Sequence, residues 1–294
     1  MKNMDHYGIR QEIRDLLRGV AGGLIFGTPI LYTMEVWFEG QAFPPQKLFF
    51  ILLASLSLNI FFSYFAGLRE KHSSGRFFYA LDDGVTSLGL GLVLALFILF
   101  LIGQLDFEQH FLGWIGRVIA EASIMSLGVT FTNFKFNKKQ SSTRALRSIR
   151  DAAASLLSPE RLQTRQDLSD LFAATVGALL FSFNVAPTEE ITMIASNLSS
   201  LDQGLLLISE VIFAFIVLYA SGLKEHVTFT KDNFFQSPLN ETVLTVSVSL
   251  CISAVLISTI GYSDTSPGDP LFLSTAIVLG LPAVIGGAAG RLVV

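Results

Sequence analysis

The chain has 294 residues, of which 51% are hydrophobic and only 15% are charged, and its formal net charge is -4. A soluble protein would carry about a quarter of its residues as charges, so the composition excludes an ordinary soluble domain and predicts an all-α polytopic membrane protein. A basic nucleic-acid surface is absent, and the single cysteine, Cys251, excludes a disulfide framework.

Eight segments are apolar and long enough to cross the membrane as helices, for which about 20 residues are needed. They lie near residues 17–37, 46–67, 85–104, 111–132, 171–192, 202–222, 241–261 and 270–290. The fifth segment is the weakest, because polar residues and a proline interrupt it between Asn184 and Glu190. Eight spans return the C-terminus to the side of the N-terminus.

The distribution of positive charge tests this count, because Lys and Arg collect in cytoplasmic loops. With the N-terminus in the cytoplasm, all but Lys47 and Arg117 of the 20 Lys and Arg residues lie on the cytoplasmic side. Removing the fifth span would move Lys224, Lys231 and Arg291 outside. We therefore expect eight spans in the inner membrane, with both termini cytoplasmic.

Two polar segments are expected at the cytoplasmic surface. Ile9 and Ile13 have helical spacing among charged residues, which indicates a short amphipathic helix before the first span. Residues 133–168 form an amphipathic linker, in which Ser158 and Pro159 provide the cap and first position of a helix. The positive charge of the linker suits contact with anionic lipid headgroups. The alternative is a simple connection between spans.

The two halves of the chain align when the sequence is shifted by 155 residues, which indicates a tandem duplication. The matches include Asp15 with Asp170, Gly22 with Gly177, Leu24 with Leu179, and Glu35 with Glu190. We therefore predict two four-span repeats, residues 1–132 and 169–294, joined by the linker 133–168. Because each repeat has an even number of spans, both copies have the same orientation and their twofold axis follows the membrane normal.

The stretch RGVAGGLIFGTPILYTMEVW, residues 18–37, and the glycine-rich final span carry a family resemblance. They resemble an uncharacterised family of integral membrane proteins from bacteria and cyanobacteria, chiefly through the motif TPILYTMEVW. The resemblance covers most of the chain. It implies a membrane topology and no particular chemistry.

Charged residues at membrane depth are the first candidates for function, since each costs about 2.5 to 3.5 kcal/mol on insertion scales. Glu210 is the clearest case, because it lies eight residues after Asp202 and fourteen before Lys224. We expect its carboxylate to bind a cation or exchange a proton. The alternative is a protonated or hydrogen-bonded packing residue.

Glu35 and Glu190 occupy matching positions in the two repeats, each after a proline, Pro29 or Pro187, that is expected to break its helix. A broken span frees backbone carbonyls, and two facing carboxylates with such carbonyls would suit a hard cation. The alternative places both acids at the outer headgroups, because Glu35 lies beside Trp37 at the outer end of its span.

The fourth span holds Arg117 and Glu121 four residues apart, on one helix face. The two residues either form an internal ion pair, or act near the outer mouth, Arg117 as a gate or counter-ion and Glu121 as an ion- or proton-binding carboxylate. Asn59 in the second span either adds a neutral oxygen to a polar core or bridges neighbouring helices.

Acids and glycines at the ends and faces of other spans have structural interpretations. Asp82 and Asp83, and likewise Glu241, are expected to cap their helices by complementing the helix dipole, or else to form an inner vestibule for cations. Glycines spaced four residues apart predict close helix packing. They are Gly19, Gly23 and Gly27 in the first span and Gly286 and Gly290 in the last.

The sequence contains no phosphate-binding loop, metal-spaced histidine cluster or catalytic arrangement, so neither an enzyme nor a cofactor is expected. The predicted function is a proton-coupled cation transporter, with Glu210 at its core and Glu35 and Glu190 near the outer entrance. The expected partners are the lipid bilayer and an inorganic cation or proton, and no nucleic acid. Which ion moves, and whether subunits associate as a homo-oligomer, stay open.

Two other functions use the same sequence features. A cation-selective channel could be lined by the same acids. A non-transporting scaffold or sensor would instead act through the cytoplasmic linker, residues 133–168.

Overall fold

The computed structural model describes residues 2–33, 35–66, 76–105, 111–138, 159–220, 237–260 and 269–292. Within these ranges the secondary structure is helical, without strands. The helices are α1 (Lys2–Leu31), α2 (Glu35–Ala42), α3 (Pro45–Ala66), α4 (Arg76–Leu101), α5 (Phe111–Lys138), α7 (Pro159–Val185), α8 (Glu190–Asn197), α9 (Ser200–Phe215), the π-helical turn η2 (Ile216–Ala220), α10 (Pro238–Ile260) and α11 (Pro270–Arg291).

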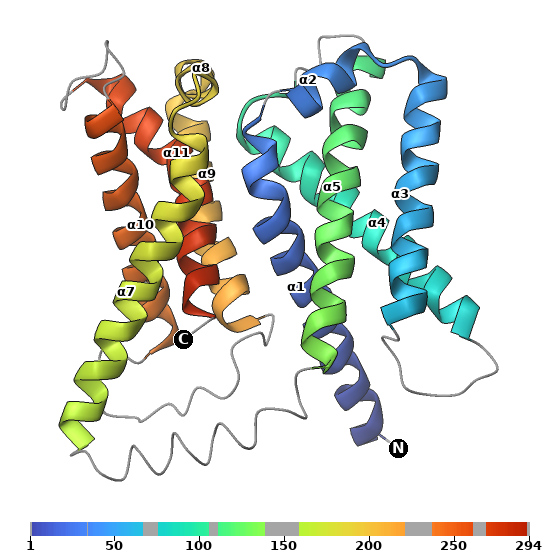
Figure 1. Cartoon of the computed structure of the whole chain (residues 1–294), viewed down its shortest axis with the longest axis horizontal. Helices are drawn as coiled ribbons and strands as arrows, with labels where there is room; N and C mark the ends of the chain where they lie inside the picture. The colour runs from blue at the N-terminus through green and yellow to red at the C-terminus, as the bar shows by residue number, and fades with distance from the viewer. Residues whose placement is uncertain are drawn as a thin grey trace.

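The helices form two groups that stand side by side, α1 to α5 and α7 to α11 (Figure 1). The start of α1 and the end of α11 lie toward one end of the molecule, which we call the terminal face. The short helices α2 and α8 lie toward the opposite end, which we call the distal face.

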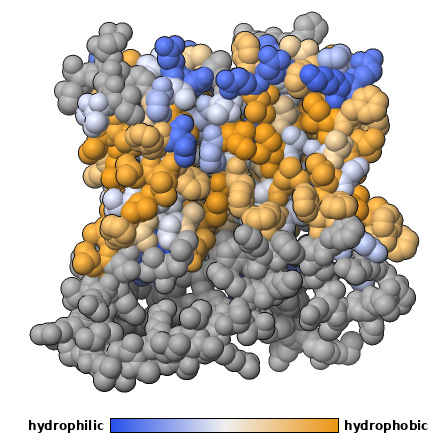
Figure 2. Space-filling view, in the orientation of Figure 1, coloured by the Kyte–Doolittle hydropathy of each residue, from blue (hydrophilic) through white to orange (hydrophobic). Residues whose placement is uncertain are grey.

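Six helices of the described part are long and apolar enough to cross a membrane, and the number rises to eight if two bent helix pairs each form one span. Large apolar side chains such as Phe50, Phe78 and Phe172 are exposed on them, which suits contact with lipid. Figure 2 shows hydrophobic side chains over the middle of the molecule and more hydrophilic ones toward the distal face. The expected all-helical membrane fold is confirmed.

The first and fifth expected spans end earlier than their hydropathy indicates. The chain bends by 81° between α1 and α2, and by 92° between α7 and α8. The break expected at Pro29 is wrong in position, because Pro29 lies inside α1, which continues to Leu31. Pro187 lies in the turn between α7 and α8, where a break was expected. The apolar residues that follow each bend belong to the short helices α2 and α8, and these two expected spans are long and apolar enough only when each bent pair is taken together.

The N-terminal segment and the linker are only partly described. The residues expected as a separate amphipathic helix, around Ile9 and Ile13, are the first turns of the continuous helix α1. The start predicted at Pro159 is confirmed as the first residue of α7. Residues 139–158 of the linker lie outside the described residues.

Glycines bring pairs of helices into close backbone contact. The prediction is confirmed for Gly286 and Gly290 of the last span. In the first span the closest backbone contact is made by Gly22, whereas Gly23 and Gly27 lie against the side chains of Leu94 and Met125. A Cβ on Gly22 of α1 would lie 2.5 Å from the carbonyl oxygen of Gly128, so the backbones of α1 and α5 are in close contact there. A Cβ on Gly177 of α7 would lie 2.2 Å from the carbonyl oxygen of Gly286, so the backbones of α7 and α11 are in close contact as well. Any larger residue at these positions would force the backbones apart.

One hydrophobic core extends through both helix groups. The Tyr32 hydroxyl at the end of α1 donates a 2.7 Å hydrogen bond to the Val278 carbonyl of α11. The rings of Phe97 in α4 and Phe213 in α9 meet edge to face, with centroids 6.0 Å apart. The two groups are therefore packed against each other.

Candidate functional site

Glu210 is positioned by α9, near the middle of the 20-residue candidate span Ser200–Tyr219. The helix starts with a capping box, in which the Ser199 hydroxyl and the Asp202 carboxylate each accept from the other residue's backbone N–H. Glu210 itself is fully buried. Its place near the middle of the candidate span agrees with the membrane depth expected from the sequence.

The Glu210 carboxylate lies where three helices of the second group meet. A Cβ on Gly280 of α11 would lie 2.8 Å from Glu210 Oε1 and 2.7 Å from Leu250 Cδ2 of α10. Neither oxygen of Glu210 has a hydrogen-bond partner among the described residues. An unpaired ionised carboxylate is very costly to bury, so this arrangement is suited to a carboxyl that holds a proton or meets a cation.

The first helix group also reaches this carboxylate. Tyr32, at the end of α1, is close enough to Glu210 for an electrostatic interaction. Its hydroxyl donates to the Val278 carbonyl, two residues before Gly280. Glu210 therefore lies near the contact between the two groups, and movement of α1 relative to α11 would change its surroundings.

Glu121 is a second buried acid, near the middle of the 22-residue candidate span Phe111–Thr132. Neither of its carboxylate oxygens has a hydrogen-bond partner in the described part of the chain. Glu121 lies one turn before Met125, whose side chain lies against Gly27 of α1. It therefore belongs to the stripe of α5 that faces α1.

The ion pair considered between Arg117 and Glu121 does not form. The Arg117 guanidinium donates to the Gln41 side chain of α2, and its Nη1 bonds to the Gln104 carbonyl. Its Cζ also lies 5.5 Å from the centroid of the Trp37 ring. These partners hold the Arg117 guanidinium at the distal face. The positive charge that helical spacing predicts beside Glu121 is therefore not placed there.

Asn59 bridges two helices, which is the structural interpretation that its sequence context left open. Its Nδ2 donates to the Ser126 hydroxyl, and its Oδ1 accepts from Thr130, both at 3.0 Å. Both partners belong to α5, and Asn59 is fully buried on α3. Its amide is thereby committed to joining α3 to α5.

Glu35 and Glu190 occupy equivalent places at the starts of α2 and α8. Glu35 is exposed and Glu190 is half-buried, and both lie at the distal face. Their carboxylates suit the positive ends of these short helices. Both acids therefore differ in depth from Glu210, which lies at mid-span.

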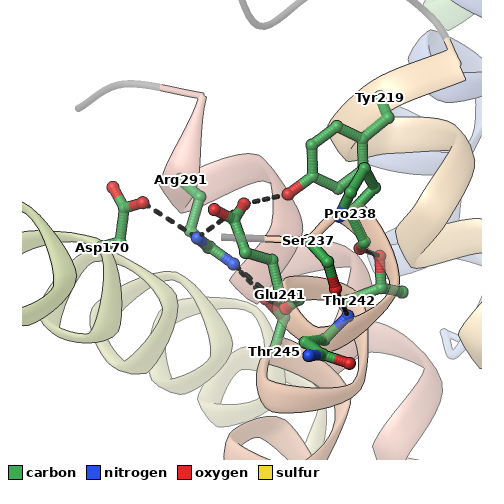
Figure 3. Close-up of polar contacts among 9 residues, drawn as sticks. Asp170, Tyr219, Ser237, Pro238, Glu241, Thr242, Thr245 and Arg291 are labelled. Atoms are coloured by element: carbon green, nitrogen blue, oxygen red, sulfur yellow. Dashed lines mark hydrogen bonds and ion pairs between the residues drawn. The ribbon is translucent and has the colours of Figure 1, made fainter. Parts of the chain in front are cut away.

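A buried ionic cluster at the terminal face was missed by the sequence analysis. Arg291 at the end of α11 pairs with Asp170 of α7 at 2.9 Å and with Glu241 of α10 at 3.1 Å (Figure 3). Its Nη1 also donates to the Thr245 hydroxyl at 2.8 Å, and the Tyr219 hydroxyl of η2 donates to Glu241. We call these five residues the Arg291 cluster. It joins η2 to α7, α10 and α11.

Glu241 lies in the first turn of α10, as expected from the sequence, where an acid complements the helix dipole. The backbone N–H of Asn240 bonds to the Ser237 hydroxyl, so Ser237 helps to cap α10. The Glu241 carboxylate faces Arg291 and Tyr219. Asp82 and Asp83 lie in the second turn of α4, which begins at Arg76, beyond the usual capping position.

Metal coordination by several acids or histidines finds no support in the described ranges. No group of three or more His, Cys, Asp or Glu side chains that could hold a metal ion is present there. Each of the buried acids Glu121 and Glu210 stands apart from such a group. The observed arrangement therefore offers single carboxyls.

Comparison with known protein families places the chain. The model of the family described as "Putative integral membrane protein (DUF2391)" matches residues 15–294, nearly the whole chain. The chain belongs to this family. No curated protein and no solved structure matches it. It is therefore an integral membrane protein, as its apolar helices also indicate, and the family description names no activity.

Proposed function

We propose that this protein is a secondary transporter for a cation, coupled to protons, with the Glu210 carboxylate as the central binding group. The main support for the proposal is the environment of the Glu210 side chain. It is fully buried at mid-span beside the contact between the helix groups, and both of its oxygens lack a hydrogen-bond partner among the described residues. An ionised carboxylate in such surroundings is energetically favourable only when it binds a cation or a proton.

The proposal includes a tandem repeat of residues 1–132 and 169–294. It is supported by α2 and α8, which each have eight residues and begin 155 positions apart, at Glu35 and Glu190. It is also supported by the close contacts of Gly22 with Gly128 and of Gly177 with Gly286. Two similar halves that can rock against each other are a common basis for alternating access.

The orientation that we propose places the terminal face in the cytoplasm and the protein in the inner membrane. This assignment rests on the excess of Lys and Arg at the terminal side of the spans. Glu35 and Glu190 would then stand at the outer entrance and attract cations. Arg117 would be a gate or counter-ion near that entrance, and Glu121 a second ion-binding carboxyl.

A transporter fits the observed packing better than a channel does. On the terminal side of Glu210, the side chains of Ala214, Val246 and Val284 form a small buried apolar cluster between α9, α10 and α11. An ion that leaves Glu210 in this direction therefore needs a conformational change. A channel would conduct in discrete single-channel steps, whereas a transporter would show flux without them.

The experiment is an ion flux assay with the purified protein in liposomes, under imposed gradients of H⁺, Na⁺, K⁺, Ca²⁺ or Mg²⁺. We expect Glu210→Gln to lower the flux at least about tenfold, the effect of losing ~1.4 kcal/mol of interaction. Glu39→Gln is the matched control, because Glu39 is an exposed acid of α2. The pair Glu35→Gln with Glu190→Gln tests the outer entrance.

The outcomes separate the proposed functions. Absence of flux for every ion and gradient would contradict transport. Equal flux in wild type and Glu210→Gln would contradict the assignment of the site. A scaffold acting through the linker predicts no flux at all, and loss of its cellular activity when residues 136–168 are deleted.

A further inference from the structure

Three hydroxyl side chains follow one buried face of α10. Thr245, Ser249 and Ser253 are spaced four residues apart, and all three are buried. The exposed residue Ser247 belongs to the opposite side of the same helix. The buried hydroxyls therefore form a line through the second helix group, which we call the α10 hydroxyl line.

The middle of this line has an unusual hydroxyl. In membrane helices, serine commonly bonds the carbonyl four residues earlier, as Ser247 does with Val243 and Ser253 with Ser249. Ser249 Oγ is buried and has no hydrogen-bond partner among the described residues. A Cβ on Gly287 of α11 would lie 2.7 Å from it. Ser249 Oγ thus occupies the place beside α11 that a side chain at position 287 would fill.

Glu210 and the middle of the line adjoin the same face of α11. Gly280 and Gly287 are seven residues apart, so they lie on the same face of α11. Gly280 adjoins Glu210 Oε1, and Gly287 adjoins Ser249 Oγ. Two partnerless buried polar groups therefore open onto one face of one helix, each at a position without a side chain.

The terminal end of the line enters the Arg291 cluster. The Thr245 hydroxyl accepts from Arg291 Nη1 at 2.8 Å, and Arg291 is paired with Asp170 and Glu241 (Figure 3). The ionisable groups along this helix contact in the described structure are thus Glu210, beside Gly280 of α11, and the Arg291 cluster, which Thr245 contacts. Tyr32, directly after α1, interacts electrostatically with Glu210.

We propose that Thr245, Ser249 and Ser253 form the inner pathway of a proton between Glu210 and the terminal face, and that the Arg291 cluster closes its end. This inference rests on the proposed function and names the ion of that site. Hydroxyls donate and accept protons in turn, as a relay requires. Metal cations such as Ca²⁺ would need six or more oxygen ligands, which single hydroxyls a turn apart do not provide.

In the structure this pathway is shut at its terminal end, where the Arg291 guanidinium bonds the Thr245 hydroxyl. The buried apolar cluster of Ala214, Val246 and Val284 lies beside it and excludes water from this part of the helix contact. Opening requires α11 to move relative to α10, which would admit water between Ser249 and Gly287. η2 joins α9 to this movement, because Tyr219 bonds Glu241 of the cluster. π-helical turns are frequent at such functional positions.

The test uses cysteine accessibility in the full-length chain. The native Cys251 is first replaced by Ala, and Ser249→Cys or Ser247→Cys is then introduced. A small, cationic, water-soluble methanethiosulfonate reagent is added on the terminal side of liposomes under a proton gradient. We expect Ser249→Cys to be modified, with loss of proton flux in proportion, while Ser247→Cys in the lipid is not. Mass spectrometry measures the modification independently of flux.

A second pair of variants tests the hydroxyl itself. Ser249→Ala is expected to lose most of the proton flux, whereas Ser247→Ala should keep it. Both changes remove one oxygen atom from the same helix, so equal thermal unfolding temperatures would show that folding is unaffected. An unmodified Ser249→Cys together with full flux in Ser249→Ala would overturn the inference and leave Ser249 as a packing residue.

Failure of this inference differs from failure of the proposed function. If Glu210→Gln keeps its flux while modified Ser249→Cys loses it, the pathway stands and Glu210 is not its binding site. If Glu210→Gln abolishes flux and neither Ser249 variant changes it, Glu210 stands and the hydroxyl line is overturned. If the wild type moves no ion and Ser249→Cys stays unmodified, both are wrong.

Discussion

At the scale of single residues, the absence of a side chain at Gly280 determines how closely Glu210 approaches α11. The atoms that a Cβ on Gly280 would meet, Glu210 Oε1 and Leu250 Cδ2, are the ends of flexible side chains. They can turn aside at small cost, whereas a backbone atom could not. The site is therefore sensitive to a methyl group that the fold itself can accommodate.

We expect Gly280→Ala to displace the Glu210 carboxylate and to lower ion flux severalfold, with little change in the unfolding temperature. Gly204→Ala is the matched control, because a Cβ at Gly204 meets nothing within 4 Å. Flux and thermal unfolding in detergent would be measured on the same preparations. Unchanged flux in Gly280→Ala would show that the carboxylate needs no space beside α11.

Single-residue predictions from the sequence succeeded where hydropathy alone decides. The depth of Glu210 in its span follows from its distance to the polar span ends, so it could be predicted, whereas its burial among α9, α10 and α11 could not. The partners of Arg117 and Arg291 could not, because they come from other helices. Arg291 and Asp170 are 121 residues apart, and a helical spacing argument reaches only to Glu121 from Arg117.

At the scale of helices, backbone contacts between glycines hold α7 against α11. Gly177 and Gly286 face each other with no room for a Cβ on either, and Gly290 approaches the Ala173 carbonyl one turn away. The helices on both sides of this contact carry members of the Arg291 cluster. Their spacing therefore affects both stability and the terminal end of the pathway.

We expect Gly177→Ala to destabilise the protein by about 1–3 kcal/mol, the usual cost of overpacking a close contact. The atom that its Cβ would meet at 2.2 Å is a backbone carbonyl oxygen, which cannot turn aside. Thermal unfolding in detergent measures the change, with Gly89→Ala as a control in open space. An unchanged unfolding temperature would mean that the two helices separate easily.

Helix type could be predicted along most of the chain, while two helix ends could not. Long apolar stretches predict α3, α4, α5, α9, α10 and α11 directly, because a helix satisfies its own backbone in lipid. Hydropathy does not show the bends after Leu31 and Val185, since α2 and α8 are themselves fairly apolar. Pro29 and Pro187 predict breaks near these bends, but not the residues at which α1 and α7 end. Hydropathy indicates which residues lie in an apolar environment, but it does not indicate where a helix changes direction.

At the scale of the whole molecule, the two helix groups that correspond to the two proposed repeats are packed against each other. Tyr32 bonds Val278, Phe97 meets Phe213, and one hydrophobic core runs through both groups. The covalent connection between them passes through residues 139–158. These contacts should hold the halves together without that connection.

We expect residues 1–138 and 159–294, expressed as two chains, to assemble in the membrane and to purify together. Affinity purification through a tag on either chain measures the association. Phe97→Ala together with Tyr32→Phe should lower the yield of the complex, because the ring contact with Phe213 and the hydrogen bond to Val278 are both lost. Separate purification of stable halves would contradict a continuous core.

The central claim, that a transported cation visits Glu210, is tested most directly by chemical labelling of that carboxyl. Dicyclohexylcarbodiimide is an apolar reagent that reacts with carboxylic acids within membranes, and mass spectrometry identifies the labelled residue. The account predicts that Glu210 is labelled, that flux falls in proportion to the labelled fraction, and that the transported ion slows the reaction. Full flux in protein completely labelled at Glu210 would contradict it.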